Sequence, residues 1–413
     1  MNFIPPLRLA PSVAHSLARV AVLLAVAALA QAQLSSGASD SLRLRTAAEL
    51  MGQGNLAAAE AELQTVIARS PKEYRALNLL GIVRAQQHRT ADAEGLFRKA
   101  IELQPEYAGA HASLGMLYLE AQRLDDALPE LETALRLDPT RTGSRAALVT
   151  TLRGLARAAA AQGEAEKALS LLLRARKTAP DDLAVSFEFG MVALRMSLYP
   201  DAATAFEQVL AAQPEDTSAL YALARTRIGL SKYEEARELF QKFVRLRPDD
   251  ASGHFGLGLV LLALHQAAEA RQQFERSVAI APAQTESFVE LGVLDLSEAQ
   301  LDHASEHFQR ALDRDPRHPG ALLGMGRVQF QRKQYDAAAN LLQRAIAVDA
   351  SLSEAHYYLG LSYARQGRQA DSASELDLAS KLEREDLNQQ RVLMKLLDSS
   401  PQDASPGDAS SPK

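Results

Sequence analysis

One interval recurs along most of this chain, and it constrains the fold more than any other feature of the sequence. Prolines are 34 residues apart over a long stretch, with a single step of 41 residues. They are Pro71, Pro105, Pro139, Pro180, Pro214, Pro248, Pro282 and Pro316. A fixed period of about 20 to 50 residues is typical of a solenoid, in which each unit buries its apolar face only by stacking on its neighbours. The chain is therefore expected to fold as one array of repeats.

Each unit predicts two amphipathic helices followed by a stop. The clearest copy is Ala108–Arg141, in which Ala108 is numbered position 1. Position 7 is large and apolar, position 8 is small, position 20 is alanine, position 24 is bulky and position 32 is proline. In this copy these residues are Leu114, Gly115, Ala127, Leu131 and Pro139. The proline is expected to end the second helix, because it cannot donate a backbone hydrogen bond and clashes with the preceding turn.

The small and bulky positions have a steric reason. Two helices approach closely only where the side chains between them are small. Glycine or alanine at positions 8 and 20 is therefore expected to leave room that the bulky residue at position 24 fills. A glycine within a helix costs about 1 kcal/mol relative to alanine, so the repeated choice of glycine at position 8 favours close packing as its cause.

By positions 7, 8, 20, 24, 27 and 32, the chain resembles the tetratricopeptide repeat (TPR) family from Asp40 to Asp386. The resemblance implies an all-α fold, a right-handed α-solenoid superhelix of about ten helix-turn-helix repeats. It also implies that the first helix of each repeat, the A helix, lines a concave groove for a peptide or partner segment. The predicted repeats are residues 40–73, 74–107, 108–141, 142–182, 183–216, 217–250, 251–284, 285–318, 319–352 and 353–386.

Three repeats depart from the pattern. Repeat 142–182 has seven extra residues, which either lengthen its A helix over Gly143–Gln162 by two turns or form a longer loop around Arg141–Arg145. Either reading predicts a bend or projection there, dividing the array into a three-repeat and a six-repeat part. Ala350 and Arg384 replace proline at the ends of the last two repeats. Residues 387–397 are expected to form a capping helix, and residues 398–413 a disordered tail.

The N-terminal residues predict a secretory signal peptide over residues 1–32. Basic residues precede an uncharged run, Val20–Ala30, and Ala30 and Ala32 provide a small-x-small cleavage pattern. The run is too short to span a bilayer, which needs about 20 apolar residues. The alternatives are an uncleaved anchor or a mispredicted N-terminal extension. Residues 33–39 are expected to be a linker, and the chain to be exported, periplasmic or extracellular after cleavage near Ala32.

Composition narrows the possible functions. The formal net charge is −6 with acidic and basic residues interspersed, so no basic footprint for nucleic acid is present. The chain has no cysteine, which excludes disulfides and thiolate chemistry. The glycine patterns of phosphate- and dinucleotide-binding loops are also lacking, and no catalytic constellation is found. We therefore expect no enzymatic activity of its own, no cofactor, no metal and no small-molecule substrate.

Five histidines are candidates for metal ligands or other functional groups. His303 and His307 lie four residues apart on a predicted helix, but a metal site needs a third ligand, so two solvated histidines are the favoured interpretation. His111, His254 and His356 all occupy position 4. They are expected to pack between helices.

The predicted partner site is a stripe along the A helices. Positions 5, 9 and 12 follow helical spacing and share one face, and the resemblance places this face on the concave side. The candidate residues are Phe187, Met191, Leu194, Tyr221, Arg225, Phe255, Leu259, Leu262, Val293, Arg327, Phe330 and Tyr357. The stripe is largely apolar, with Arg225 and Arg327 as isolated charges. Alternatively, neighbouring turns of the solenoid cover much of it.

These features predict a non-enzymatic scaffold or adaptor that is exported and binds a protein or peptide through an apolar or amphipathic segment. A holdase-like chaperone or assembly factor for envelope or secreted proteins is the alternative, suggested by the apolar stripe. A partner-dependent enzyme subunit is the third hypothesis. Nucleic acid is not an expected partner, and membrane contact is expected only through an uncleaved signal.

Overall fold

The computed structural model describes residues 38–398, and side chains from residue 39 to residue 384. The predicted signal peptide, most of the predicted linker and the predicted tail from residue 399 lie outside the described residues. The described part of the chain is built from helices and turns and contains no strand. None of its helices is both long enough and apolar enough to cross a membrane.

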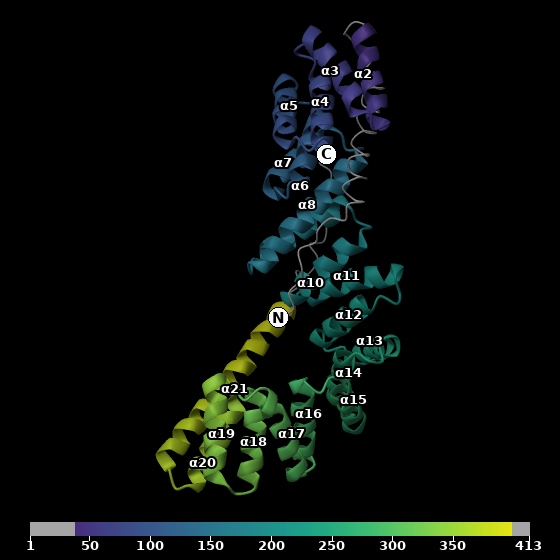
Figure 1. The fold of residues 1–413 in the computed structure, drawn as a ribbon. Helices are drawn as coiled ribbons and strands as arrows, with labels where there is room; N and C mark the ends of the chain where they lie inside the picture. The colour runs from purple at the N-terminus through teal and green to yellow at the C-terminus, as the bar shows by residue number, and fades with distance from the viewer. Residues whose placement is uncertain (1–37, 399–413) are drawn as a thin grey trace, which may run out of the picture. The chain divides into compact units, whose positions relative to one another are not determined.

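The helices come in antiparallel pairs, an A helix followed by a B helix (Figure 1). The A helices are α2 (Ala38–Gly52), α4 (Tyr74–Gln86), α6 (Ala108–Glu120), α8 (Thr142–Ala161), α10 (Leu183–Arg195), α12 (Thr217–Gly229), α14 (Ala251–Ala263), α16 (Thr285–Ser297), α18 (Pro319–Gln331) and α20 (Ser353–Arg365). The B helices are α3 (Leu56–Arg69), α5 (Thr90–Leu103), α7 (Leu124–Leu137), α9 (Ala165–Thr178), α11 (Tyr199–Ala212), α13 (Tyr233–Leu246), α15 (Ala267–Ile280), α17 (Leu301–Arg314), α19 (Tyr335–Val348) and α21 (Gln369–Asp398). This arrangement is the predicted all-α solenoid of TPR helix pairs.

The helices form two compact units that divide between Ala219 and Leu220, near the start of α12. The expected division at repeat 142–182 is therefore wrong. The seven extra residues of that repeat lie in α8, which has 20 residues where the other A helices from α4 onward have 13. An insertion of about two helical turns keeps the apolar face aligned, so α8 still packs against α6, α7 and α9.

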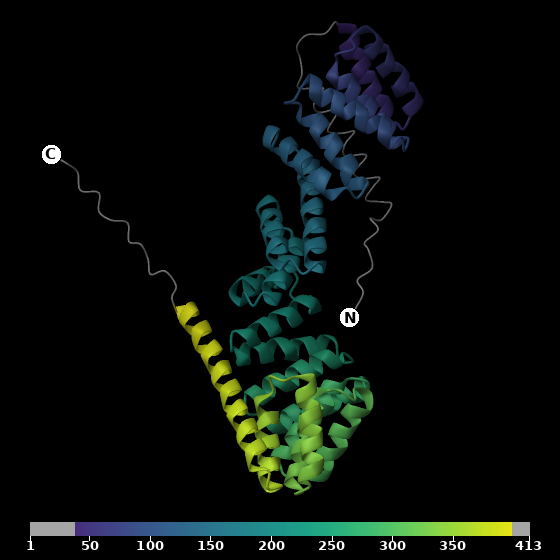
Figure 2. The same cartoon turned by 90° about the vertical axis from the view of Figure 1, so that its left-hand side faces the viewer.

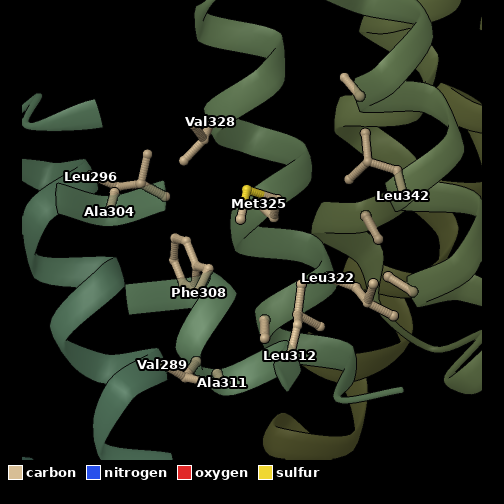
Figure 3. Packing of buried hydrophobic residues seen from close by; sticks show 14 of the residues in the cluster. Val289, Leu296, Ala304, Phe308, Ala311, Leu312, Leu322, Met325, Val328 and Leu342 are labelled. Carbon is tan, nitrogen blue, oxygen red and sulfur yellow. The ribbon is translucent and has the colours of Figure 1, made fainter. Parts of the chain in front are cut away.

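The predicted packing of small side chains against bulky ones is confirmed in the core. A Cβ on Gly292 would lie 2.7 Å from Cε1 of Phe308, the bulky residue of the same repeat. Gly324 of the next A helix abuts the same end of the ring, since a Cβ there would also lie nearest Cζ and Cε1. Figure 3 shows Phe308 among Leu296, Ala304 and other buried residues of this cluster. The phenyl ring is thus held between two glycines on successive A helices.

The turn between each A helix and its B helix contains a residue in the left-handed conformation at position 15. Glycine occupies this place in three turns, at Gly54, Gly163 and Gly367. The other seven residues are His88, Gln122, Ser197, Ser231, His265, Ala299 and Lys333, with φ between 57° and 61°. At Ala299 the turn is closed by two backbone bonds, from the Ala299 N–H to the Leu296 carbonyl (3.1 Å) and from the Gln300 N–H to the Asp295 carbonyl (2.8 Å). This is a Schellman ending, which sequence reasoning did not predict.

The last B helix does not end where the repeat pattern ends. Residues 387–397 were expected to form a separate capping helix, but α21 is one continuous helix of 30 residues, shown in yellow in Figure 2. The separate helix is therefore wrong. Arg384 stands where eight of the repeats have proline and, unlike proline, it can continue a helix, although α19 ends at Val348 without a proline at Ala350.

Candidate partner-binding stripe

The twelve candidate residues fall into the two units. Phe187, Met191 and Leu194 lie on α10 in the first unit, and the other nine lie on A helices of the second unit. None of the twelve is buried, and Met191, Val293 and Tyr357 are 36%, 39% and 47% exposed. Arg225 is also exposed, and the remaining eight are half-buried. Each unit therefore presents candidate side chains to solvent, but most of them are also packed in part.

The aromatic residues at position 5 are held by their own repeats. Ring centroids lie 5.6 Å apart for Phe187 and Phe206, and 5.9 Å apart for Phe255 and Phe274. Tyr221 packs against Phe240 in the same way, at 5.5 Å. One side of each position-5 ring thus belongs to the core. A charged substitution there would disturb folding as well as binding, so Val293 and Tyr357 are cleaner reporters of the stripe.

Arg327 is not the isolated charge that the sequence predicted. Its Nη1 lies 2.9 Å from Oε1 of Glu354 on the next A helix, α20. Its guanidinium group also lies over the Tyr358 ring, 5.3 Å from the centroid. The prediction failed because Glu354 belongs to another repeat, and spacing within one helix does not reveal a partner across two helices. Arg225, by contrast, is exposed.

Helix α16 carries two carboxylates that sequence reasoning missed. Glu286 is exposed at position 2, and Glu290 is half-buried at position 6 of the same helix. Burial raises the pKa of Glu290 above its ordinary value. A signal was present, because position 6 is small in three other repeats of this unit, at Ala222, Gly256 and Gly324.

The three histidines at position 4 form hydrogen bonds with both ring nitrogens. Nε2 of His111 lies 2.9 Å from the Pro105 carbonyl oxygen, and Nδ1 lies 2.6 Å from Oε2 of Glu130. His254 and His356 repeat this arrangement. All three are buried, so the prediction that they pack between helices is confirmed. The hydrogen bond to Glu130 raises the pKa of His111, because it stabilises the charged ring.

His303 and His307 are not two equivalent solvated histidines. His303 is exposed and contacts Gln300, whereas Nδ1 of His307 lies 2.7 Å from Oδ2 of the buried Asp295. The other carboxylate oxygen of Asp295 accepts a 2.7 Å hydrogen bond from Arg271. The described residues contain no group of three or more potential ligands that could hold a metal ion. His307 instead helps to satisfy a carboxylate between α15, α16 and α17.

Three family models match the chain. One tetratricopeptide repeat model matches residues 44–108, 187–228 and 221–285, and a second matches residues 107–181. The middle TPR-like domain of cilia and flagella-associated protein 70 matches residues 263–383. No curated protein matches the chain.

Several solved structures are similar to the chain. The APC/C heterotetramer Cut9–Hcn1 is 12% identical with a TM-score of 0.46, and the match covers 88% of this chain and 95% of that one. MamA from Desulfovibrio magneticus RS-1 is 24% identical with a TM-score of 0.35, covering 43% and 96%. YrrB, described as a TPR protein with an unusual peptide-binding site, is 22% identical with a TM-score of 0.37, covering 45% and 95%.

The family assignment combines two observations. The two tetratricopeptide repeat models together cover more than half of the chain. The paired helices of the described residues carry the small and bulky packing positions that the repeats require. The chain belongs to the tetratricopeptide repeat family.

Proposed function

We propose that the protein is an exported, non-enzymatic scaffold that binds an apolar or amphipathic segment of a partner protein along the A helices of the second unit. The observation that carries this proposal is the stripe itself. Val293 and Tyr357 are among the most exposed large apolar side chains of the described residues, and half-buried apolar residues continue the stripe on α14 and α18. Covering such side chains is favourable by about 25 cal/mol per Å² of apolar surface removed from water.

Membership in a family of helical repeats supports a protein partner, because stacked repeats present an extended surface to long segments. Export rests on the sequence of residues 1–32, with its apolar run and its small-x-small pattern. The absence of a catalytic constellation in the sequence supports a binding role over an enzymatic one. An adaptor is distinguished from a holdase by the number of partners it retains.

Photo-crosslinking tests the surface. A photoreactive phenylalanine analogue is placed at Val293 or at Tyr357 in the full chain, and separately at Val348 as a control. Val348 is a matched control because it is also 39% exposed and lies in the same unit, but on the B helix α19. The proposal predicts adducts with one partner at the first two positions and none at Val348. Equal adducts at all three positions, or at Val348 alone, would contradict it.

Two further measurements address export and partner choice. N-terminal sequencing of the protein from cell fractions is expected to find a chain that begins at Gln33 outside the cytoplasm. A cytoplasmic chain that retains Met1 would refute export. In a competition assay, unlabelled partner is expected to remove the crosslink at Tyr357, whereas unfolded chains are not. Competition by any unfolded chain would instead favour the holdase-like alternative.

A further inference from the structure

The two carboxylates of α16 lie beside the stripe residue Val293 and lack partners among the described residues. Glu286 and Glu290 are four residues apart, so they share one face of the helix, and Val293 follows Glu290 by three residues on that face. Neither carboxylate has an ion pair or a side-chain hydrogen bond among the residues that the structure describes. A largely apolar surface therefore presents two carboxylates that have no partner among the described residues.

Equivalent carboxylates elsewhere in the array are paired with arginine. Glu354, at position 2 of its repeat, pairs with Arg327 at 2.9 Å. Glu188, at position 6, accepts hydrogen bonds from Arg153 at 2.8 and 2.9 Å and from Arg157 at 2.6 Å. In both cases the arginine lies on the preceding A helix. At these two positions the array elsewhere pairs a carboxylate with an arginine of the preceding A helix. The carboxylates of α16 have no such arginine.

The residues that face position 6 can be identified from the next pair of A helices in the same unit. Tyr358, at position 6 of α20, lies under the guanidinium of Arg327 at position 9 of α18. Its ring centroid also lies 5.6 Å from that of Phe330, at position 12 of α18. Position 6 of an A helix therefore faces positions 9 and 12 of the preceding A helix.

Applied to α14 and α16, the same relation predicts apolar residues opposite Glu290. Positions 9 and 12 of the preceding helix, α14, are Leu259 and Leu262. Leucine can neither donate a hydrogen bond nor supply a positive charge, and burial of Glu290 raises its pKa without an opposing cause. The carboxylate is therefore partly removed from water, and no side chain of the described residues compensates it.

We infer that the stripe of the second unit binds an apolar or amphipathic segment that carries an arginine or lysine side chain, which pairs with Glu290 and Glu286. The inference rests on the proposed function, because it specifies the chemistry of the segment bound at that surface. Glu188 and Arg153 show the geometry that such a pair adopts, with two parallel N–H···O bonds. A charge-assisted bond of this kind strengthens an apolar contact and fixes the position of the bound segment along the stripe. The negative pair also disfavours segments with an acidic residue at that place.

The test uses the full chain and a random-peptide display library, selected in parallel on several variants. The selecting proteins are wild type, Glu290→Gln, Glu290→Arg and, as a matched control, Glu269→Gln. Glu269 is an exposed carboxylate on the B helix α15 of the same unit. Because Glu290 has no ion pair or side-chain hydrogen bond within residues 39–384, its substitution is not expected to impair folding, and circular dichroism checks this. Peptides selected on wild type are then titrated against every variant.

The expected result is enrichment of arginine or lysine at one fixed place within an otherwise apolar sequence. Glu290→Gln is expected to lose this enrichment and to weaken a selected peptide by about ten-fold, whereas Glu269→Gln changes neither. Glu290→Arg is expected to select aspartate or glutamate at the same place. Apolar peptides without a basic residue, or the same enrichment on Glu290→Gln, would overturn the inference while leaving the proposed function intact. Selected peptides whose binding is unaffected by Val293→Gln would refute both.

Discussion

Replacing Gly292 by alanine tests the packing that sets the spacing of the repeats. The new Cβ would lie 2.7 Å from Phe308, short of the 3.4–4 Å of an ordinary van der Waals contact. The ring cannot swing away freely, because Gly324 abuts it from the next A helix. Overpacking of a filled core costs about 1–3 kcal/mol, whereas alanine gains about 1 kcal/mol of helix propensity over glycine. The free energy of unfolding is therefore expected to fall by up to about 2 kcal/mol, instead of rising by about 1 kcal/mol as helix propensity alone would predict.

Urea denaturation followed by circular dichroism measures this change, and Gly95→Ala is its control. Gly95 is exposed within α5 with nothing near its Cβ position, so alanine there is expected to stabilise by about 1 kcal/mol. Phe308→Ala, which removes the ring, should relieve part of the effect of Gly292→Ala, because the added Cβ then meets no phenyl group. A Gly292→Ala protein as stable as Gly95→Ala, or strictly additive effects of the two changes near Phe308, would refute the steric argument.

Three further predictions concern stability. Ala299→Gly is expected to raise the free energy of unfolding by about 1 kcal/mol, because Ala299 has φ of 58°; an unchanged melting temperature would argue against this. The hydrogen bond to Glu130 raises the pKa of His111 in the folded protein. The stability that this bond provides is therefore fully present below the ordinary pKa of 6.5 and is lost as the pH rises through the raised pKa of the folded state. His111→Gln should flatten that part of the stability–pH profile. Burial raises the pKa of Glu290, so stability should fall as pH rises above 4.5 through the folded pKa; Glu290→Gln should remove this fall and be more stable at neutral pH.

The sequence predicted the parts of the fold that repeat. Helix pairing and the packing of Gly292 against Phe308 could be predicted because each recurs at a fixed position of the repeat. The reason found for one repeat therefore applies to the others. The left-handed turns were missed because most of them lack glycine. Ala299 gives no local signal of its own, and the pattern emerges only when position 15 is compared with Gly54 and Gly163.

The candidate site was predicted less completely because its interactions cross from one helix to another. Spacing along one helix placed Arg327 in the stripe, but Glu354 lies one repeat away and neutralises it. His307 was treated as a solvated side chain because its partner, Asp295, lies on the other helix of its repeat. Such pairs depend on the distance between helices, which periodicity does not provide.

The most direct test of the account is the affinity of the crosslinked partner for two matched double variants. Val293→Gln with Tyr357→Gln removes the exposed apolar residues of the stripe, and Val348→Gln with Leu246→Gln removes two comparably exposed residues from B helices. Isothermal titration calorimetry is expected to show a weakening of about ten-fold or more for the stripe variant and little change for the control. Equal affinity for both double variants, with both chains folded by circular dichroism, would contradict binding along the A helices.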